Sequence, residues 1–199
     1  MPASNQPARA AYLQVGGKST RMGRNKAFID FQGEILLARA IRTLTESCGE
    51  VTIVGDPRIF ARYGRVISDI FPNCGPLGGI HAALTDARAE LNLMLAVDMP
   101  FVTAELVKFL FDAAGDTQAA VTVPRTSRGL QPLCAVYRRE FAGVAEQALK
   151  AGNYKIDAAF AEVSIRVIAE PELAAAGFSE TSFFNVNTPE DCRAADLIP

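Results

Sequence analysis

The chain has 199 residues, of which 49% are hydrophobic, and a formal net charge of −2 at pH 7. This length and composition can bury a substantial core, and one domain is the expected organisation. The nearly balanced charge is unsuited to a protein held broadly to nucleic-acid phosphates, so we expect no nucleic-acid partner. No apolar run approaches the roughly 20 residues of a membrane-spanning helix, so we expect no membrane partner.

The four cysteines stand far apart without a Cys-x-x-Cys pair, and the chain has one histidine. This spacing favours reduced thiols over a disulfide framework or a zinc site. Residues 1–9 are polar and contain proline, and they lack the apolar segment of a signal peptide. We therefore expect a cytoplasmic protein with a flexible tail at 1–9 and a single domain at 10–199.

From residue 10 onwards, predicted strands and helices alternate. Short apolar runs predict strands at 10–15, 51–55, 65–69, 91–97, 119–124, 133–137 and 163–169. Apolar residues at helical spacing predict helices at 35–48, 78–90 and 141–152, one beginning after Thr103 and a last one beginning at Thr188. The alternation and the fully apolar strand at 91–97 predict a three-layer α/β fold with a mostly parallel central sheet.

A glycine-rich and basic stretch, VGGKSTRMGRNK from Val15 to Lys26, follows the first predicted strand. It is not a Walker A loop, because Tyr12 stands where that motif requires glycine, and its glycine spacing does not fit the dinucleotide-binding motif. Successive backbone amides in a glycine turn can bind an anion, and nearby cations can neutralise a triphosphate. The residues alone leave two interpretations open, a triphosphate-binding loop and a surface turn with solvated basic side chains.

Asp98 and Asp69 each end a predicted strand. In open α/β sheets, ligands bind beyond the carboxyl ends of the strands. Magnesium takes one or two carboxylates together with substrate phosphates, so Asp98 after the apolar run 91–97 is a candidate Mg²⁺ ligand. An aspartate before a turn is also common as a structural residue. Asp69 fits a residue that ends a strand at a turn.

The order of the motifs resembles that of a known family. The stretch from Val15 to Lys26 is similar to the Leu-Ala-Gly-Gly-x-Ser-x-Arg-Met-Gly-x-x-Lys signature of nucleotidyltransferases. It is followed by Gly75-Pro76-Leu77-Gly78-Gly79, Val97-Asp98-Met99-Pro100, Gln131-Pro132-Leu133 and Phe184-Asn185-Val186-Asn187-Thr188-Pro189. Over residues 12–195, the chain most resembles the molybdenum cofactor guanylyltransferase (MobA) family, within the MobA-like NTP transferase superfamily.

The resemblance implies a Rossmann-like nucleotidyltransferase fold and a Mg²⁺-dependent enzyme. Such an enzyme transfers GMP from GTP to the phosphate of molybdenum-bearing molybdopterin and releases pyrophosphate. The implied partners are GTP, the molybdenum cofactor, and molybdoenzyme chaperones or molybdopterin molybdenumtransferase. The alternatives left open are transfer from CTP to the same cofactor, transfer from an NTP to a sugar phosphate, and a nucleotide-binding regulatory or adaptor protein without turnover.

The resemblance also assigns roles to residues. The catalytic residues would be Arg21, Lys26 and Asp98, with Asp98 holding the metal. The nucleotide-binding residues would be Gln14, Val15, Gly16, Gly17, Lys26, Asp69, Gly78, Gly79 and Asp98. The acceptor-binding residues would be Pro132, Asn185 and Asn187, although the two asparagines also fit an Asx turn before the last helix.

The chain departs from the family pattern at two places. The usual Leu-Ala before the glycine pair is Gln14-Val15 here, and an asparagine expected near Val54-Gly55 is missing. The first departure leaves backbone contacts possible, whereas the second puts one nucleotide contact in question. Neither the choice of base nor the oligomeric state follows from the residue pattern.

Overall fold

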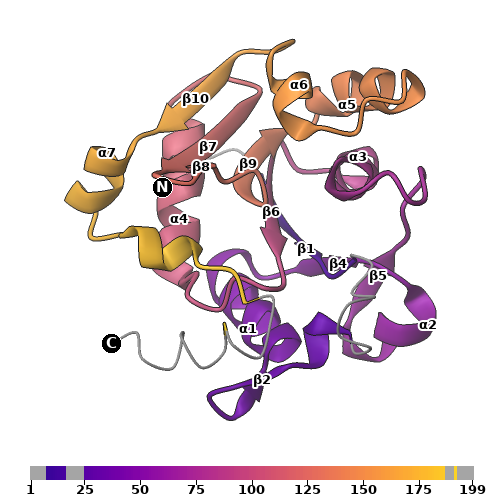
Figure 1. Cartoon of the computed structure of the whole chain (residues 1–199), viewed down its shortest axis with the longest axis vertical. Helices are drawn as coiled ribbons and strands as arrows, with labels where there is room; N and C mark the ends of the chain where they lie inside the picture. Colours follow the sequence, from indigo (N-terminus) through magenta and orange to yellow (C-terminus); the bar gives the residue numbers. More distant parts are fainter. Residues whose placement is uncertain (1–7, 17–24, 187–190, 192–199) are drawn as a thin grey trace, which may run out of the picture.

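The computed structural model describes residues 8–16, 25–186 and 191, and its centre is an 8-stranded sheet (Figure 1). The order of strands is β10-β7-β9-β6-β1-β4-β5, with β8 paired to β7. Their bounds are β1 (Arg9–Gln14), β4 (Val51–Val54), β5 (Arg65–Ile67), β6 (Leu91–Ala96), β7 (Val121–Thr126), β8 (Gly129–Leu130), β9 (Cys134–Arg138) and β10 (Ile165–Ile168). Neighbours are parallel except that β9 is antiparallel to β6 and β7, and β8 to β7. The predicted, mostly parallel sheet is confirmed.

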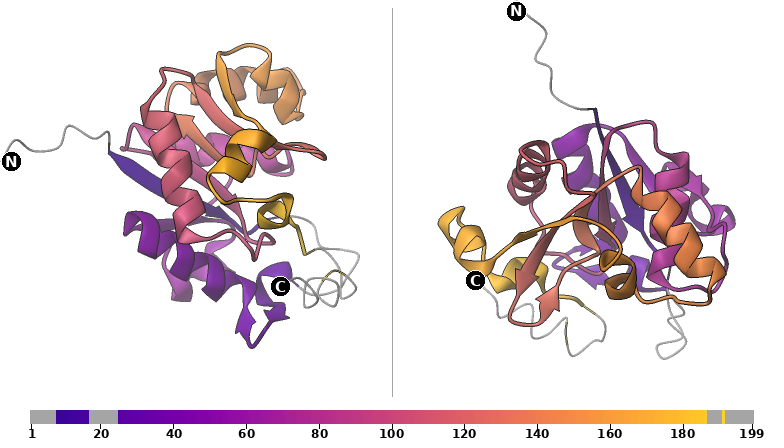
Figure 2. Two further views of the ribbon diagram at one scale, coloured as in Figure 1. Left: turned by 90° about the vertical axis from the view of Figure 1, so that its left-hand side faces the viewer. Right: turned by 90° about the horizontal axis from the view of Figure 1, so that it is seen from above.

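Helices cover both faces of this sheet, which confirms the three-layer prediction (Figure 2). On one face lie α1 (Leu36–Cys48) and α4 (Ala104–Gly115), and on the other lie α3 (Pro76–Asp86) and α5 (Phe141–Lys150). The shorter elements are α2 (Pro57–Phe60), α6 (Ile156–Phe160), α7 (Glu170–Ala175), the hairpin of β2 (Asp30–Phe31) and β3 (Glu34–Ile35), and the 3₁₀ turns η1 (Lys26–Phe28), η2 (Ala61–Tyr63) and η3 (Glu180–Phe183).

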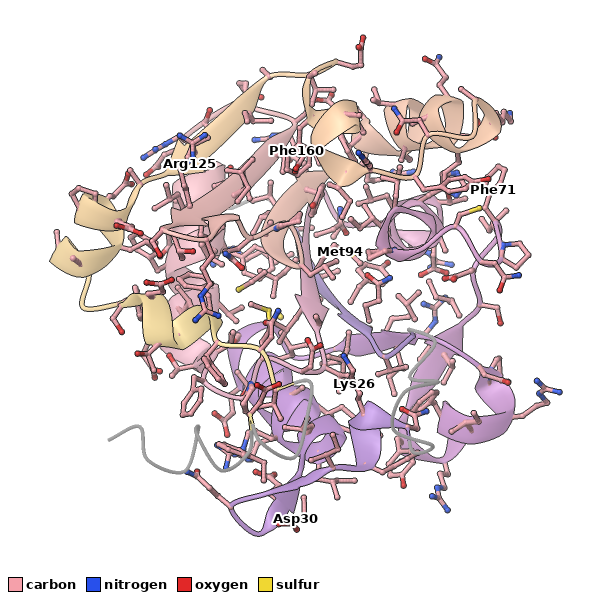
Figure 3. All side chains as sticks on the ribbon, viewed as in Figure 1. Lys26, Asp30, Phe71, Met94, Arg125 and Phe160 are labelled. Atoms are coloured by element: carbon pink, nitrogen blue, oxygen red, sulfur yellow. The ribbon has the colours of Figure 1, made fainter. Side chains whose placement is uncertain are left out.

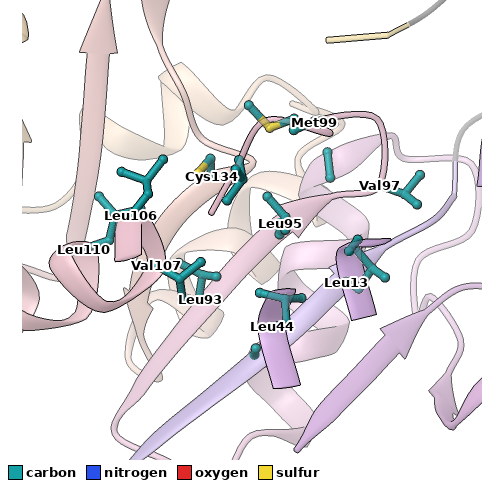
Figure 4. Close-up of a cluster of buried hydrophobic side chains, with 14 of the residues drawn as sticks. Leu13, Leu44, Leu93, Leu95, Val97, Met99, Leu106, Val107, Leu110 and Cys134 are labelled. Carbon is teal, nitrogen blue, oxygen red and sulfur yellow. The ribbon is translucent and has the colours of Figure 1, made fainter. Parts of the chain in front are cut away.

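The central strands β1 and β6 are buried on both sides, because successive residues point to opposite faces. Leu13 and Leu93 pack with α1 and α4 in the cluster of Figure 4, whereas Tyr12 and Met94 pack with α3 and α5. Both faces therefore require apolar residues, which explains the unbroken run that predicted β6. Truncating Leu93 to alanine would cost roughly 2–5 kcal/mol.

Most predicted elements form, and Thr103 caps α4 as predicted by accepting a hydrogen bond from Leu106 N. The predicted start and end of α3 were wrong, since the helix runs over Pro76–Asp86 instead of 78–90. Pro76 opens it after Gly75 at φ 68°, because the first helical position needs no N–H. The glycine pair lies inside the helix, and its role is close packing instead of turning the chain.

The predicted tail at 1–9 ends one residue too late, because Arg9 already belongs to β1. The helix predicted to begin at Thr188 lies outside the described residues, apart from Asp191. Within the described ranges, no helix has the length and apolar character to cross a membrane. Cys48, Cys74 and Cys134 are free thiols, in line with the absence of a disulfide framework among them.

Candidate active site

A cavity of about 520 Å³ opens at the carboxyl ends of β1 and β6. These strands are parallel neighbours with Gln14 opposite Ala96, so the loops that follow them emerge at the same edge of the sheet. This is where ligands bind in open α/β sheets. The cavity is lined by Gln14, Val15, Gly16, Lys26, Pro76, Ala96, Val97, Asp98, Met99, Arg128, Leu130, Gln131, Pro132, Leu133, Phe183 and Asn185.

Many of the predicted site residues meet in this cavity although they are far apart in the sequence. Those that line it are Gln14, Val15, Gly16, Lys26, Asp98, Pro132 and Asn185. Gly17, Arg21 and Asn187 lie outside the described residues. Asp69 is exposed in the loop after the edge strand β5, and Gly78 and Gly79 are buried in α3, so these three do not line the cavity.

Lys26 and Asp98 form an ion pair in the cavity, with 3.4 Å between Nζ and Oδ2. Lys26 begins η1, which is held by Asn25 as its side chain accepts a hydrogen bond from Ala27 N at 3.1 Å. Asp98 follows β6, and its carbonyl oxygen accepts a hydrogen bond from Val186 N at 2.8 Å. Three separate segments of the chain thereby fix the position of this pair, and Figure 3 shows Lys26 in this region.

Burial raises the pKa of the Asp98 carboxyl, and the neighbouring Lys26 ammonium opposes that rise only in part. A desolvated carboxylate gains from a bound cation, because the cation replaces the lost hydration. Among the described residues, no cluster of three or more acidic, histidine or cysteine side chains could hold a metal. A cation here would therefore rest on Asp98 and take its other ligands from phosphates and water, which is how Mg²⁺ commonly binds.

Both departures from the family pattern lie in closely packed surroundings. The Gln14 amide donates to Pro76 O at 3.3 Å and lies so close to Gly79 that a Cβ there would be 2.3 Å from Nε2. A Cβ at Gly55 would be 2.5 Å from Cγ2 of Val15. The side chains of Gln14, at the end of β1, and of Val15, just after it, thus each occupy the space beside a glycine of a neighbouring segment, and this end of the strand is closely packed.

Comparison with known proteins decides the family. Residues 11–165 match the model of the MobA-like NTP transferase domain. A probable molybdenum cofactor guanylyltransferase of Pelotomaculum thermopropionicum is 38% identical over 94% of this chain and 91% of that protein. Another from Clostridium perfringens is 32% identical over 96% of each chain. The chain belongs to the molybdenum cofactor guanylyltransferases of the MobA-like NTP transferase family.

A solved structure agrees with this assignment. The molybdopterin-guanine dinucleotide biosynthesis protein A of Archaeoglobus fulgidus has a TM-score of 0.84 and 26% identity, over 96% of this chain and 97% of that one. The similarity extends well beyond the cavity to nearly the whole of both chains. The predicted nucleotidyltransferase fold of the Rossmann-like type is confirmed.

Nine residues of the cavity lining were not among the predicted site residues, and the polar side chains among these nine are Arg128 and Gln131. Gln131 was part of a recognised motif, and its amide donates to Thr126 Oγ1 at 3.0 Å, which secures the turn beside it. Arg128 lies in a short hairpin turn and belongs to none of the quoted motifs. Only the folded arrangement of β7, β8 and η3 brings it to the cavity, so the sequence carries no signal for it.

Proposed function

We propose that this chain is a Mg²⁺-dependent molybdenum cofactor guanylyltransferase that acts in the cytoplasm. It transfers GMP from GTP to the phosphate of molybdenum-bearing molybdopterin. The observation that carries the proposal is the Lys26–Asp98 pair in one cavity with predicted nucleotide residues and predicted acceptor residues. The names of relatives that are 32–38% identical over nearly the whole chain support the same reaction.

The proposed reaction is one displacement at phosphorus. An oxygen of the acceptor phosphate attacks the α-phosphorus of GTP and forms a new P–O bond. The bond from the α-phosphorus to the bridging oxygen of the β-phosphate breaks, and pyrophosphate leaves with that electron pair. Because the acceptor oxygen is already anionic, the enzyme needs no strong general base. The absence of a histidine from the described cavity lining fits this requirement.

The chain's own groups would bind and orient the phosphates. Lys26 places a cation beside Asp98, and Gly16 brings backbone to the cavity without a side chain. Arg21, which lies outside the described residues, would add a second cation on the same loop. Asp98 would hold Mg²⁺, which neutralises charge on the phosphate oxygens when bound. Catalysis of this kind depends mainly on position and electrostatics.

The two substrates would enter from opposite sides of the Lys26–Asp98 pair. Gln14 and the start of α3 lie on the side assigned to the nucleotide. Pro132 and Asn185 lie on the side assigned to the acceptor, where Tyr137 OH donates to Pro132 O at 2.7 Å and holds that loop. After transfer, the dinucleotide product would pass to molybdoenzyme chaperones, or the cofactor would arrive from molybdopterin molybdenumtransferase.

The test is pyrophosphate release by the full-length protein with GTP, CTP, ATP or UTP, in the presence and absence of Mg²⁺ and of molybdopterin. The proposal expects release that requires GTP, metal and molybdopterin together. Asp98→Ala should reduce it by at least about 10²-fold, as expected for loss of a group that stabilises transferring phosphates. Asp116→Ala provides a matched control, because Asp116 is an exposed aspartate just after α4 that does not line the cavity.

Each alternative predicts a different result in this panel. Turnover with CTP and molybdopterin would identify CTP, and not GTP, as the nucleotide substrate. Turnover only with a sugar phosphate would identify that compound, and not molybdopterin, as the acceptor. Nucleotide binding without release under any acceptor would identify a binding protein. Full activity of Asp98→Ala would refute the proposed role of the carboxylate even if GTP is the substrate.

A further inference from the structure

Arg128 projects from a rigid turn at one end of the cavity. Thr126 pairs with Gly129 across the hairpin of β7 and β8, which leaves Ser127 and Arg128 as its loop. The Arg128 N–H donates to Thr126 Oγ1 at 3.2 Å, and Gly129 supplies the positive φ of 105° that closes the turn. The backbone is therefore fixed, whereas the side chain is 68% exposed and can reorient.

The guanidinium of Arg128 contacts the segment that leads to the acceptor residues. Its Nε lies 3.3 Å from Oε1 of Glu180 in η3, and its Cζ lies 5.8 Å from the centre of the Phe184 ring. Ser127 Oγ donates to the same Glu180 oxygen at 2.7 Å. Glu180 therefore keeps a hydrogen bond when Arg128 moves away, and an ion pair this exposed contributes little to stability.

Arg128 also connects the main cavity with a smaller one. It lines both the cavity of about 520 Å³ and a neighbouring cavity of about 200 Å³ whose walls include Glu180 and Phe184. Residues 184–186 bridge from this end to Asp98, because Val186 N donates to the Asp98 carbonyl. Two residues of extended chain span about 7 Å. A molecule whose phosphate reacts beside Asp98 would extend its other end towards Arg128.

We propose that Arg128 and Phe184 bind the flat heterocycle of the acceptor, and that Arg128 leaves Glu180 to do so. This inference rests on the proposed function, since it takes the acceptor to be a phosphate-bearing pterin. A planar guanidinium stacks on ring systems and donates two parallel hydrogen bonds to neighbouring ring acceptors, as a lysine ammonium does not. Asn185, next to Phe184, adds an amide beside the same ring.

The charges of the cavity support this assignment. Among its described lining residues, the basic ones are Lys26 and Arg128. Lys26 lies beside Asp98, where the phosphates react, which leaves Arg128 for the distal part of the acceptor. A sugar phosphate has no planar ring to stack on an arginine and a phenylalanine. Arg128 therefore selects for a flat acceptor and disfavours the sugar-phosphate alternative.

The experiment measures steady-state KM values for molybdopterin and for GTP in full-length Arg128→Gln, Arg128→Lys and Glu180→Gln. We expect Arg128→Gln to raise the KM for molybdopterin by roughly 10-fold, within the range of a desolvated cation–ring contact, and to leave the KM for GTP within about twofold. Arg128→Lys should not restore the wild-type KM for molybdopterin, because lysine lacks the planar guanidinium. Glu180→Gln should lower the KM for molybdopterin, because it releases Arg128. Added to Arg128→Gln, the same substitution should leave the KM for molybdopterin unchanged.

Arg125→Gln is the matched control, since Arg125 is an exposed arginine of β7 that lines neither cavity and lies away from Lys26 in Figure 3. An unchanged molybdopterin KM in Arg128→Gln, or full rescue by lysine, would overturn the proposal. A raised KM for molybdopterin in Glu180→Gln would refute the proposal that Arg128 leaves Glu180 to bind the acceptor.

Equilibrium binding of molybdopterin without GTP separates the two hypotheses. Binding that depends on Arg128 in a protein that does not turn over GTP would refute the proposed function alone. Turnover of GTP with binding that is independent of Arg128 would refute this inference alone.

Discussion

Gly79→Ala tests the packing of α3 against the end of β1. The added Cβ would lie 2.3 Å from Nε2 and 2.8 Å from Cδ of Gln14, a side chain that is only 7% exposed. The amide must then leave Pro76 O, which loses a hydrogen bond of about 1 kcal/mol. Overpacking adds roughly 1–3 kcal/mol, and alanine regains about 1 kcal/mol of helix propensity. The expected net loss of unfolding free energy is about 1–3 kcal/mol.

Urea denaturation followed by circular dichroism measures this loss, and Gly143→Ala in α5 is the matched control. A Cβ at Gly143 meets nothing within 4 Å, so that variant should gain about 0.5–1 kcal/mol. Adding Gln14→Ala should restore part of the stability of Gly79→Ala. Because Gln14 lines the cavity and a Cβ at Gly79 pushes its side chain away from α3, Gly79→Ala should also raise the KM for GTP. Wild-type stability and an unchanged KM in Gly79→Ala would refute this reasoning.

The remaining predictions concern the cavity and its edge. Because folding raises the pKa of Asp98, its contribution to stability is present below the unfolded pKa and is lost as pH rises through the folded pKa. As the pH rises through the folded pKa, Asp98→Asn should therefore become more stable relative to wild type. Chemical denaturation at several pH values measures this, and a difference in unfolding free energy that does not change with pH would contradict the pKa shift. Pyrophosphate release should fall as Asp98 is protonated, at a higher pH than for an ordinary aspartate. Lys26→Met should reduce release by roughly 10²-fold without unfolding the protein, and wild-type kcat/KM would contradict its role. Gly55→Ala should lower the melting temperature, since its Cβ would lie 2.5 Å from Val15, and Val15→Ala should restore it.

Much of the fold followed from local patterns in the sequence. The apolar run of β6 reads as a buried strand because both of its faces are covered, and Thr103 caps α4 through a bond that depends only on neighbouring residues. The strand-to-helix alternation requires parallel pairing for most of the sheet. Asp98 was identifiable as a carboxylate at the end of a predicted strand, and Lys26 through the family signature that follows the first strand.

The start of α3 and the role of its glycines needed the tertiary structure. In sequence, Gly78-Gly79 has the composition of a turn. In the structure, the missing Cβ of Gly78 leaves room for the Phe71 carbonyl of the preceding loop, and that of Gly79 leaves room for Gln14, which is distant along the chain. Arg128 and Glu180 likewise come from segments that only the folded sheet brings together. Local patterns thus predicted most strands and helices and singled out Lys26 and Asp98 as candidate site residues. Contacts between segments far apart in the sequence determined the shape of the cavity and which further side chains reach it.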